Sequence, residues 1–235
     1  MKTILKSALS SAALVFCLFL RPAHADTIAH WTFEPLALSA ANTNTPPDGW
    51  LNDIAPETGS GTASGFHADT ATAYSTPAGN GSPTSISANH WSVNDYYEFA
   101  ISTSGFKDIN LSYDQTGSST GPANFQLSYS VNGTDFTPFD SYTVSQVSWS
   151  SGSSTGSSAH AFDLSSVTDL NNQPAVYFQI VDVGTASIGG SVVASGGTDR
   201  IDNFIVTATL VPEPSIIAIS FVGGFICLMA ARRKR

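Results

Sequence analysis

Strict alternation of apolar and polar residues limits what this chain can fold into more than any other feature of its sequence. The alternation runs through residues 107–115 and recurs over 97–101, 123–131 and 176–180. A period of two buries one face of a β-strand and leaves the other face in water, as in antiparallel sheets. Because no helical stripe appears between the two chain ends, the sequence predicts an all-β fold, an antiparallel β-sandwich.

Turns rich in Gly, Ser and Asn separate the expected strands. Asn132-Gly133 indicates a hairpin between two of them, and residues 163–172 indicate a helical turn. Residues 39–65, 145–158 and 183–198 read as loops. We expect strands over residues 27–33, 66–74, 91–101, 107–115, 123–131, 136–144, 159–164, 175–182 and 200–209.

Residues 1–25 have the three parts of a secretory signal peptide. Two lysines open the segment, an apolar run follows over residues 8–20, and Ala23 and Ala25 form a small-x-small cleavage pattern. The apolar run is too short to cross about 30 Å of hydrocarbon comfortably. We therefore expect signal peptidase to cut after Ala25; an uncleaved N-terminal anchor is the alternative.

Residues 211–235 also have three parts in order. The segment opens with a Pro-Glu-Pro motif, formed by Val211, Pro212, Glu213 and Pro214. An apolar stretch over 215–231 follows, near the short limit for a transmembrane helix. The chain closes with four basic residues, Arg232, Arg233, Lys234 and Arg235. Basic residues stay on the cytoplasmic side of a membrane, which places everything before them outside.

This tail resembles the PEP-CTERM sorting domain of Gram-negative bacteria. The resemblance implies recognition by an exosortase-type membrane enzyme and removal of the tail. It further implies passage through an inner-membrane intermediate to the cell surface or extracellular matrix, in strains that make exopolysaccharide. The first alternative to a sorting domain is a simple single-pass membrane anchor. A lipid-anchor signal is a second, although such tails lack both the basic end and the Pro-Glu-Pro motif.

Residues 26–210 form one domain between the two targeting segments, and its composition excludes several classes of function. All 18 acidic residues lie between Asp26 and Pro214, where Lys107 and Arg200 are the only basic residues, so this stretch carries a net charge of −16. Such a surface repels nucleic acid. Both cysteines, Cys17 and Cys227, lie in the targeting segments. The domain therefore has no disulfide framework, no thiolate metal site and no cysteine nucleophile.

Four short motifs carry a second resemblance, at residues 29–34, 127–136, 175–180 and 200–206. Their order resembles the jelly-roll ectodomains of PEP-CTERM proteins and, more distantly, concanavalin-like and carbohydrate-binding modules. The resemblance implies that the first and last strands pair. It does not fix a function, because this fold supports many.

The closing strand has an irregular pattern that bears on metal binding. Phe204 and Val206 set one face, whereas Ile201 has the opposite parity, so we expect a β-bulge near Asp202. A bulge beside the first strand would turn Asp202 and Glu34 inward. The jelly-roll resemblance implies a structural calcium ion there, held by Glu34, Asp202 and Asp199 as oxygen ligands. The alternative is an aspartate that satisfies turn amides; no other cofactor is expected.

Two of the four tryptophans, Trp50 and Trp149, lie in polar stretches. Exposed aromatic rings stack on sugar faces, so Trp50 and Trp149 are the candidate glycan-binding residues. The alternative is that each covers an open edge of the sandwich.

Catalysis has little support in the sequence, and no residue is assigned a catalytic role. No Gly-x-Ser-x-Gly elbow, His-Glu-x-x-His motif or phosphate-binding glycine loop is present, and no spacing singles out a pair of carboxylates. The sequence therefore predicts a non-enzymatic cell-surface or matrix protein. A carbohydrate-binding module acting on exopolysaccharide is the first alternative, and a polysaccharide hydrolase is the second.

Overall fold

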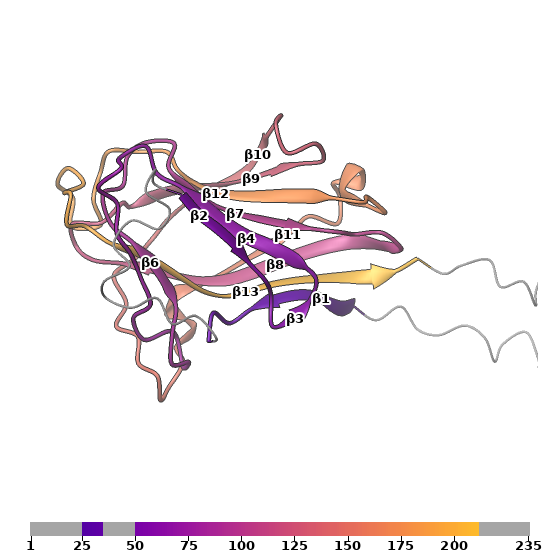
Figure 1. The fold of residues 1–235 in the computed structure, drawn as a ribbon, viewed down its shortest axis with the longest axis horizontal. Helices are drawn as coiled ribbons and strands as arrows, with labels where there is room; N and C mark the ends of the chain where they lie inside the picture. Colours follow the sequence, from indigo (N-terminus) through magenta and orange to yellow (C-terminus); the bar gives the residue numbers. More distant parts are fainter. Residues whose placement is uncertain (1–24, 35–49, 212–235) are drawn as a thin grey trace, which may run out of the picture.

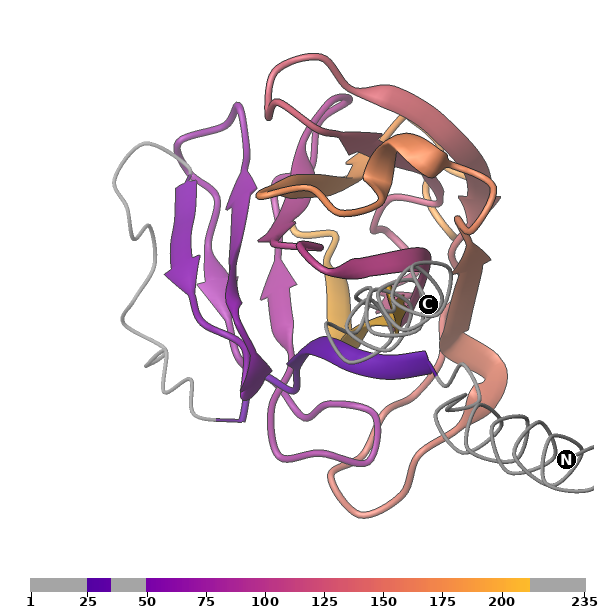
Figure 2. The same cartoon turned by 90° about the vertical axis from the view of Figure 1, so that its right-hand side faces the viewer.

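A computed structural model describes residues 25–34 and 50–211 of the chain. The described residues form two antiparallel sheets that pack face to face (Figure 1). Figure 2 views this sandwich from the end at which the first strand begins and the last strand ends. The predicted all-β sandwich is confirmed.

The seven-stranded sheet is built around the last strand, β13. Its main order is β11-β8-β13-β1-β3, with β6 paired to β13 and β5 paired to β6. Its strands are β1 (Ala25–Trp31), β3 (Thr58–Gly59), β5 (Tyr74–Ser75), β6 (Ile86–Ala88), β8 (Phe106–Gly117), β11 (Ala159–Asp163) and β13 (Asp199–Leu210).

The six-stranded sheet has the order β10-β9-β12-β7-β4-β2. Its strands are β2 (Trp50–Ile54), β4 (Gly61–Phe66), β7 (Tyr96–Ile101), β9 (Asn124–Ser130), β10 (Thr137–Thr143) and β12 (Val176–Asp182). The expected hairpin at Asn132 is confirmed, because β9 and β10 pair on either side of it. The expected helical turn is a 3₁₀ turn over Thr168–Leu170.

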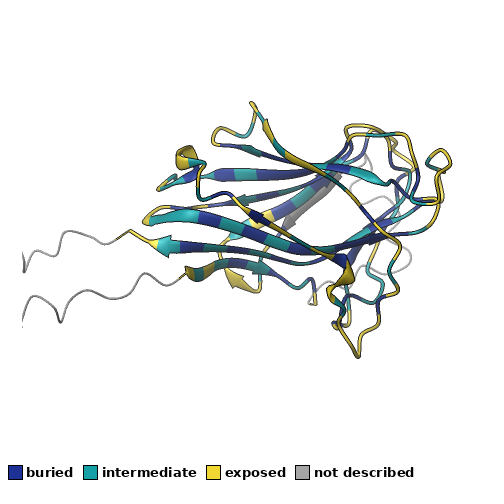
Figure 3. Cartoon of the chain, turned by 180° about the vertical axis from the view of Figure 1, so that it is seen from behind, coloured by how far each residue is buried: buried dark blue, intermediate teal, exposed yellow. Residues whose placement is uncertain are grey.

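The inward residues of both sheets form one apolar core, and buried residues alternate with partly exposed ones along the strands (Figure 3). At the centre, the ring of Phe204 in β13 stacks on Phe99 in β7, with centroids 3.5 Å apart. The ring of Trp31 in β1 packs edge-on against both. The Trp31 indole N–H donates to the carbonyl of Ile54 at 2.9 Å, which satisfies its polar atom inside the core.

The first and last strands pair, as the jelly-roll resemblance implies. Ala25 lies opposite Thr209 and Trp31 lies opposite Phe204. Because the pairing is antiparallel, β1 begins and β13 ends at the same end of the sandwich (Figure 1). The long loop over residues 183–198 lies at the opposite end.

The predicted bulge in the closing strand is confirmed. The register between β13 and β8 shifts between Asp202 and Ile205, and Asn203 has a φ of 51°. This irregularity lets Ile201 and Phe204 both reach the core, although they differ in parity, and both are fully buried.

The strand prediction is wrong near the N-terminal part of the domain. Residues 39–65 were expected to be a loop, but β2, β3 and most of β4 lie in this range; residues 66–74 were expected to be a strand, but β4 ends at Phe66. The strand β4 is rich in Gly, Ala, Ser and Thr, so its own composition gives little signal. It forms because β2 and β7 supply ladder partners on both sides.

No helix within the described ranges is long and apolar enough to cross a membrane. The predicted transmembrane stretch 215–231 lies outside the described residues, as does most of the predicted signal peptide.

Replacing Phe204 by Ala removes the ring that joins the two sheets. We expect the free energy of unfolding to fall by about 3–5 kcal/mol, since a buried aromatic ring leaves a cavity. Urea unfolding followed by tryptophan fluorescence measures this change. Leu210→Ala is the control, because Leu210 is 54% exposed in the same strand and should change the stability by less than about 0.5 kcal/mol. Equal losses in the two variants would contradict this account of the core.

Candidate functional site

The outer face of the six-stranded sheet carries a group of outward side chains that combines aromatic rings with a carboxylate and an amide. In β7, Tyr97, Phe99 and Ile101 point into the core, so Tyr96 and Glu98 lie on the opposite, outer face. We call the outer surface formed by Phe66, Tyr96, Glu98 and Gln179 the Tyr96 face.

Two aromatic rings lie side by side on the Tyr96 face. Phe66 in β4 lies directly opposite Tyr96 in β7, and their ring centroids are 5.7 Å apart at an interplanar angle of 34°. Both residues are half-buried rather than covered. The register also pairs Trp50 in β2 with Phe66, so three aromatic residues occupy one row of the sheet. The position of the Trp50 side chain lies outside the described structure.

A carboxylate and an amide form the next row of the Tyr96 face. Glu98 lies opposite Gln179 in β12, and the Gln179 amide donates to Glu98 Oε2 at 2.8 Å. Burial raises the pKa of Glu98 above its ordinary value, and the bond from Gln179 opposes this rise. Burial also raises the pKa of Tyr96, and the nearby Glu98 charge adds to the effect. Glu98 is partly exposed, whereas only 9% of Gln179 is exposed, so Glu98 is the accessible polar group beside the rings and Gln179 holds it in place.

Tyr177, on the same outer face of β12, is half-buried and lies against the turn between β9 and β10. A Cβ placed on Gly133 would lie 3.1 Å from the Tyr177 ring, and Gly133 has a φ of 73°. Glycine at this position therefore permits both the turn and the close approach to the ring.

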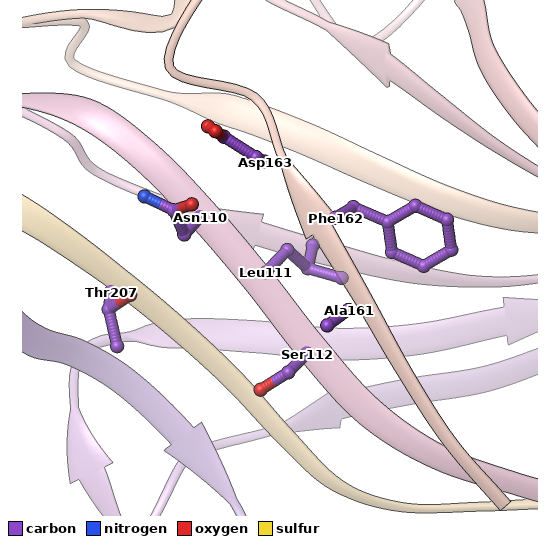
Figure 4. A pocket seen from close by; sticks show the side chains of 7 residues that line it. All are labelled: Asn110, Leu111, Ser112, Ala161, Phe162, Asp163 and Thr207. Atoms are coloured by element: carbon purple, nitrogen blue, oxygen red, sulfur yellow. The ribbon is translucent and has the colours of Figure 1, made fainter.

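The other sheet has a shallow hollow on its outer face. Its volume is about 280 Å³, and Asn110 and Ser112 of β8, Thr207 of β13 and Asp163 of β11 line it (Figure 4). Ala161 leaves it open because its side chain is short. No aromatic ring pair lies in this hollow, so it offers hydroxyl, amide and carboxylate groups without a stacking platform.

Asp202, a predicted calcium ligand, fixes the loop before β6 to the closing strand. Its Oδ2 accepts from Ser82 Oγ at 2.7 Å and from the Asn80 N–H at 2.8 Å, and its Oδ1 accepts from the Asn203 N–H at 2.8 Å. The side chain is fully buried. Burial raises its pKa to about 6, against the opposing effect of these hydrogen bonds. This arrangement matches the alternative in which an aspartate satisfies turn amides.

The other two predicted ligands do not join Asp202. Glu34 is exposed, so the expectation that the bulge turns it inward is wrong; its backbone N–H faces Thr32 Oγ1 at 3.5 Å. Asp199 is buried and accepts from Gln115 Nε2 at 3.0 Å. Over residues 25–34 and 50–211, no three His, Cys, Asp or Glu side chains form a group that could hold a metal ion. Calcium at Glu34, Asp202 and Asp199 stays a prediction.

The expectation that Trp149 is exposed is wrong. Only 9% of Trp149 is exposed, and its indole N–H donates to Ser158 Oγ at 2.9 Å. The polar sequence around Trp149 does not indicate this burial. The neighbouring Ser148 and Ser150 are exposed, whereas Trp149 between them is buried. Of the predicted sorting motif, only Val211 is described, and its N–H donates to the Gly105 carbonyl at 2.8 Å.

Sequence reasoning missed Phe66, Tyr96, Glu98 and Gln179 as a group. The period-two pattern predicts the inward residues of β7 and β12. It predicts only that the residues between them face solvent, and it assigns them no role. An aromatic residue at an outward position of a strand, such as Tyr96, was the available signal. Its partner Phe66 was hidden because β4 was not predicted.

No family model and no curated protein matches this chain. Among solved structures, the family-22 carbohydrate-binding and family-10 catalytic modules of a Clostridium thermocellum xylanase, bound to xylohexaose, match with 15% identity and a TM-score of 0.45. That match covers 81% of this chain and 29% of the xylanase chain. The chain thus spans less than a third of that protein's length.

Two further structures are similar at comparable levels. A xylan-binding domain from Paenibacillus barcinonensis matches with 9% identity and a TM-score of 0.41, covering 82% of this chain and 100% of that one. A family-61 carbohydrate-binding module in complex with β-1,4-galactotriose matches with 10% identity and a TM-score of 0.37, covering 71% and 98%. At these TM-scores the function has to be argued from the chain's own residues.

The buried carboxyls make the stability depend on pH. Burial raises the pKa of Asp182 and of Asp202 to about 6, above about 4 in an unfolded chain. The folded state therefore binds these protons more tightly, and the stabilisation is complete below about pH 4 and is lost as the pH rises through about 6. We expect the thermal midpoint, measured in chelator, to fall across this window.

Asp202→Asn separates this effect from the other carboxyls of the chain. The variant should show a shallower decline of the midpoint between pH 4 and pH 7, because one of the buried carboxyls with a raised pKa is gone. Asp163→Asn at an exposed site is the control and should keep the wild-type slope. A slope in Asp202→Asn equal to that of the wild type would contradict the assignment.

Proposed function

We propose that this protein is an exported, non-catalytic surface or matrix protein whose β-sandwich binds neutral polysaccharide through the Tyr96 face. The observation that carries the proposal is the half-buried Phe66–Tyr96 ring pair beside the Glu98–Gln179 pair. Aromatic residues that remain accessible on the polar face of a sheet combine an apolar ring with polar neighbours, which is the chemistry of sugar recognition.

Each row of the face suits a different part of a sugar. The rings of Phe66 and Tyr96 provide flat apolar surface for the C–H face of a pyranose. The partly exposed Glu98 accepts hydrogen bonds from hydroxyl groups, and the bond from Gln179 holds its carboxylate in place. Because the rows lie on adjacent, rigid strands, the side chains are held in place before the ligand arrives, which lowers the entropy lost on binding.

Charge favours a neutral ligand over an anionic one. The stretch between Asp26 and Pro214 carries a net charge of −16, and Glu98 adds a carboxylate within the face itself. A polymer rich in uronic acids or sulfate would be repelled at low salt. A neutral polymer would be bound with little dependence on salt, because its contacts are hydrogen bonds and ring stacking.

The chemistry of Glu98 favours binding over hydrolysis. A glycoside hydrolase needs two carboxyl groups that flank the scissile bond, one acting as acid and the other as base or nucleophile. The cross-strand partners of Glu98 are Gln179 and Ser64, and neither is a carboxyl group that could take the second role. The hydrolase reading therefore has no specific observation in its favour.

Retention of the full-length protein, purified in detergent, on immobilised polysaccharides tests the proposal. Xylan and the exopolysaccharide of the source strain serve as ligands, with alginate as an anionic comparison. Phe66→Ala and Tyr96→Ala should each weaken binding about tenfold, equivalent to about 1.4 kcal/mol. Glu98→Gln should weaken it less, because the amide still offers one acceptor.

Controls on the opposite sheet separate this face from the hollow near Asn110. Asn110→Ala and Thr207→Ala remove polar groups from that hollow and should leave retention unchanged. If Phe66→Ala and Tyr96→Ala are retained like the wild type but the two control variants are not, the assignment of binding to the Tyr96 face is wrong. Release of reducing sugar over time by the wild-type protein would show hydrolysis instead.

The delivery of the domain to the surface is the second part of the proposal. The signal-like residues 1–25 and the PEP-CTERM-like residues 211–235 support processing by signal peptidase and by an exosortase-type enzyme. In support, β1 begins and β13 ends at the same end of the sandwich, so residues 1–25 and 211–235 adjoin the domain at one end. The loop over residues 183–198 therefore lies at the end of the domain farther from these junctions.

Mass spectrometry of the protein recovered from the cell envelope and medium tests this route. We expect an N-terminus at Asp26 and a C-terminus trimmed near Pro212. Replacing both Pro212 and Pro214 by Ala should leave the N-terminal cut unchanged and abolish trimming of the tail. The intact chain in the cytosol, with neither end cut, would contradict the proposal.

A further inference from the structure

Two buried carboxylates stand at the base of the longest described loop. Strand β12 ends at Asp182 and β13 begins at Asp199, so the loop over residues 183–198 starts and ends beside an aspartate. Both side chains are fully buried. The two residues come from different sheets, and each lies at an inward position of its strand.

Each carboxylate has one bonded oxygen and one oxygen without a partner. Asp182 Oδ1 accepts from the Gly184 N–H at 3.1 Å, and Asp199 Oδ1 accepts from Gln115 Nε2 at 3.0 Å. The Oδ2 atoms of both residues are buried and have no hydrogen-bond partner. A buried carboxylate oxygen without a partner is strongly unfavourable, so this pair calls for a positive charge or a proton.

Contacts between the two sheets bring the Asp199 end of β13 close to β7, which neighbours β12. The Tyr97 hydroxyl donates to the Asp199 carbonyl at 3.2 Å, and Tyr97 lies in β7, the ladder neighbour of β12. The two sheets therefore approach each other at this end of the core. Burial raises the pKa of Asp199 well above its usual range, and the charge of Asp182 adds to this rise.

Other charged groups near this pair do not neutralise it. Asp95, whose carbonyl accepts from the Asp182 N–H at 2.9 Å, raises the pKa of Asp182, and its own carboxylate lies 3.2 Å from Nδ1 of the buried His67. Arg200 follows Asp199 but is half-exposed, and its effect on Asp199 is the smallest of the causes. The Lys107 ammonium pairs with Asp108.

We propose that Asp182 and Asp199 bind one divalent cation, with calcium as the ion of matching chemistry, at the base of the loop over residues 183–198. Calcium takes oxygen ligands, and two carboxylates neutralise its charge. Since no third acidic or histidine side chain joins them within the described ranges, main-chain carbonyls and water complete the coordination. This site lies on the inner side of β12, whereas the Tyr96 face lies on the outer side of the same sheet, and the cation does not depend on carbohydrate binding.

The cation would fix the loop to the rest of the domain. The middle of the loop is already tied to residues 118–121, as the Gly189 N–H donates to the Ser119 carbonyl at 2.7 Å and the Ala194 N–H donates to the Thr120 carbonyl at 3.0 Å. A cation between Asp182 and Asp199 would close its two ends together. The loop would then be held at both its base and its middle.

Calcium binding to the full-length protein in detergent, stripped with chelator beforehand, tests the proposal. Calcium should raise the thermal midpoint of the wild type, and terbium should bind with luminescence sensitised by the nearby Tyr97 and Trp91 rings. Asp182→Asn and Asp199→Asn should each weaken binding of both ions about tenfold or more. Both variants should fold, because the amide fills the same volume without a buried charge; circular dichroism checks this.

Three further variants identify the site. Asp202→Asn and Glu34→Gln test the alternative calcium position, and Asp163→Asn tests an exposed carboxylate; all three should bind calcium as the wild type does. Loss of binding in Asp202→Asn with retention in Asp182→Asn would overturn the proposal in favour of the other position. The proposal would also be overturned if the wild type bound neither ion and Asp182→Asn had a higher thermal midpoint than the wild type. That result would show that a proton, and not a cation, neutralises the pair.

Discussion

The stacked contact between Phe204 and Phe99 joins the two sheets, and the rest of the structure depends on it. Phe204 belongs to β13, the strand with the most partners in the seven-stranded sheet, and Phe99 belongs to a central strand of the six-stranded sheet. Trp31 packs against both rings from the first strand. The two ends of the domain's sequence therefore meet at the centre of its core, so the fold is complete only when the last strand is in place.

The bulge in β13 allows one strand to place apolar side chains in the core and to place Asp202 where it bonds to the loop before β6. Before the bulge, Asp199 and Ile201 point inward; after it, Phe204 does so with the opposite parity. At the bulge itself, Asp202 holds the backbone of the loop at Asn80. A regular strand with the same residues would expose either Ile201 or Phe204, at a cost of lost apolar burial.

The two faces of the six-stranded sheet have different chemistry because side chains alternate along each strand. Except for Asp182 at the end of β12, the inner positions of β7 and β12 carry apolar or aromatic side chains that pack in the core, whereas the outer positions provide Tyr96, Glu98 and Gln179. The rigidity of the inner layer holds the outer side chains in place. Binding through the outer sheet face and a cation at the loop base would thus use opposite sides of the same strands, because Val181, next to Asp182, pairs with Tyr96.

The class of fold, the cysteine-free and acidic character of the domain and most strand positions from residue 96 onward follow from the amino-acid sequence, because alternation and turn residues are local properties. The β13 bulge follows as well, since the parity of Ile201 and Phe204 conflicts within one strand. Four features appear only in the folded domain: β4 is a strand, Trp149 is buried, Glu34 is exposed and Phe66 contacts Tyr96. Each of these depends on partners distant in sequence: a weak strand forms when its neighbours supply hydrogen bonds, and burial depends on what packs above a residue. A local sequence pattern does not predict such contacts. The Tyr96 face and the Asp182–Asp199 pair are therefore visible only in the folded domain.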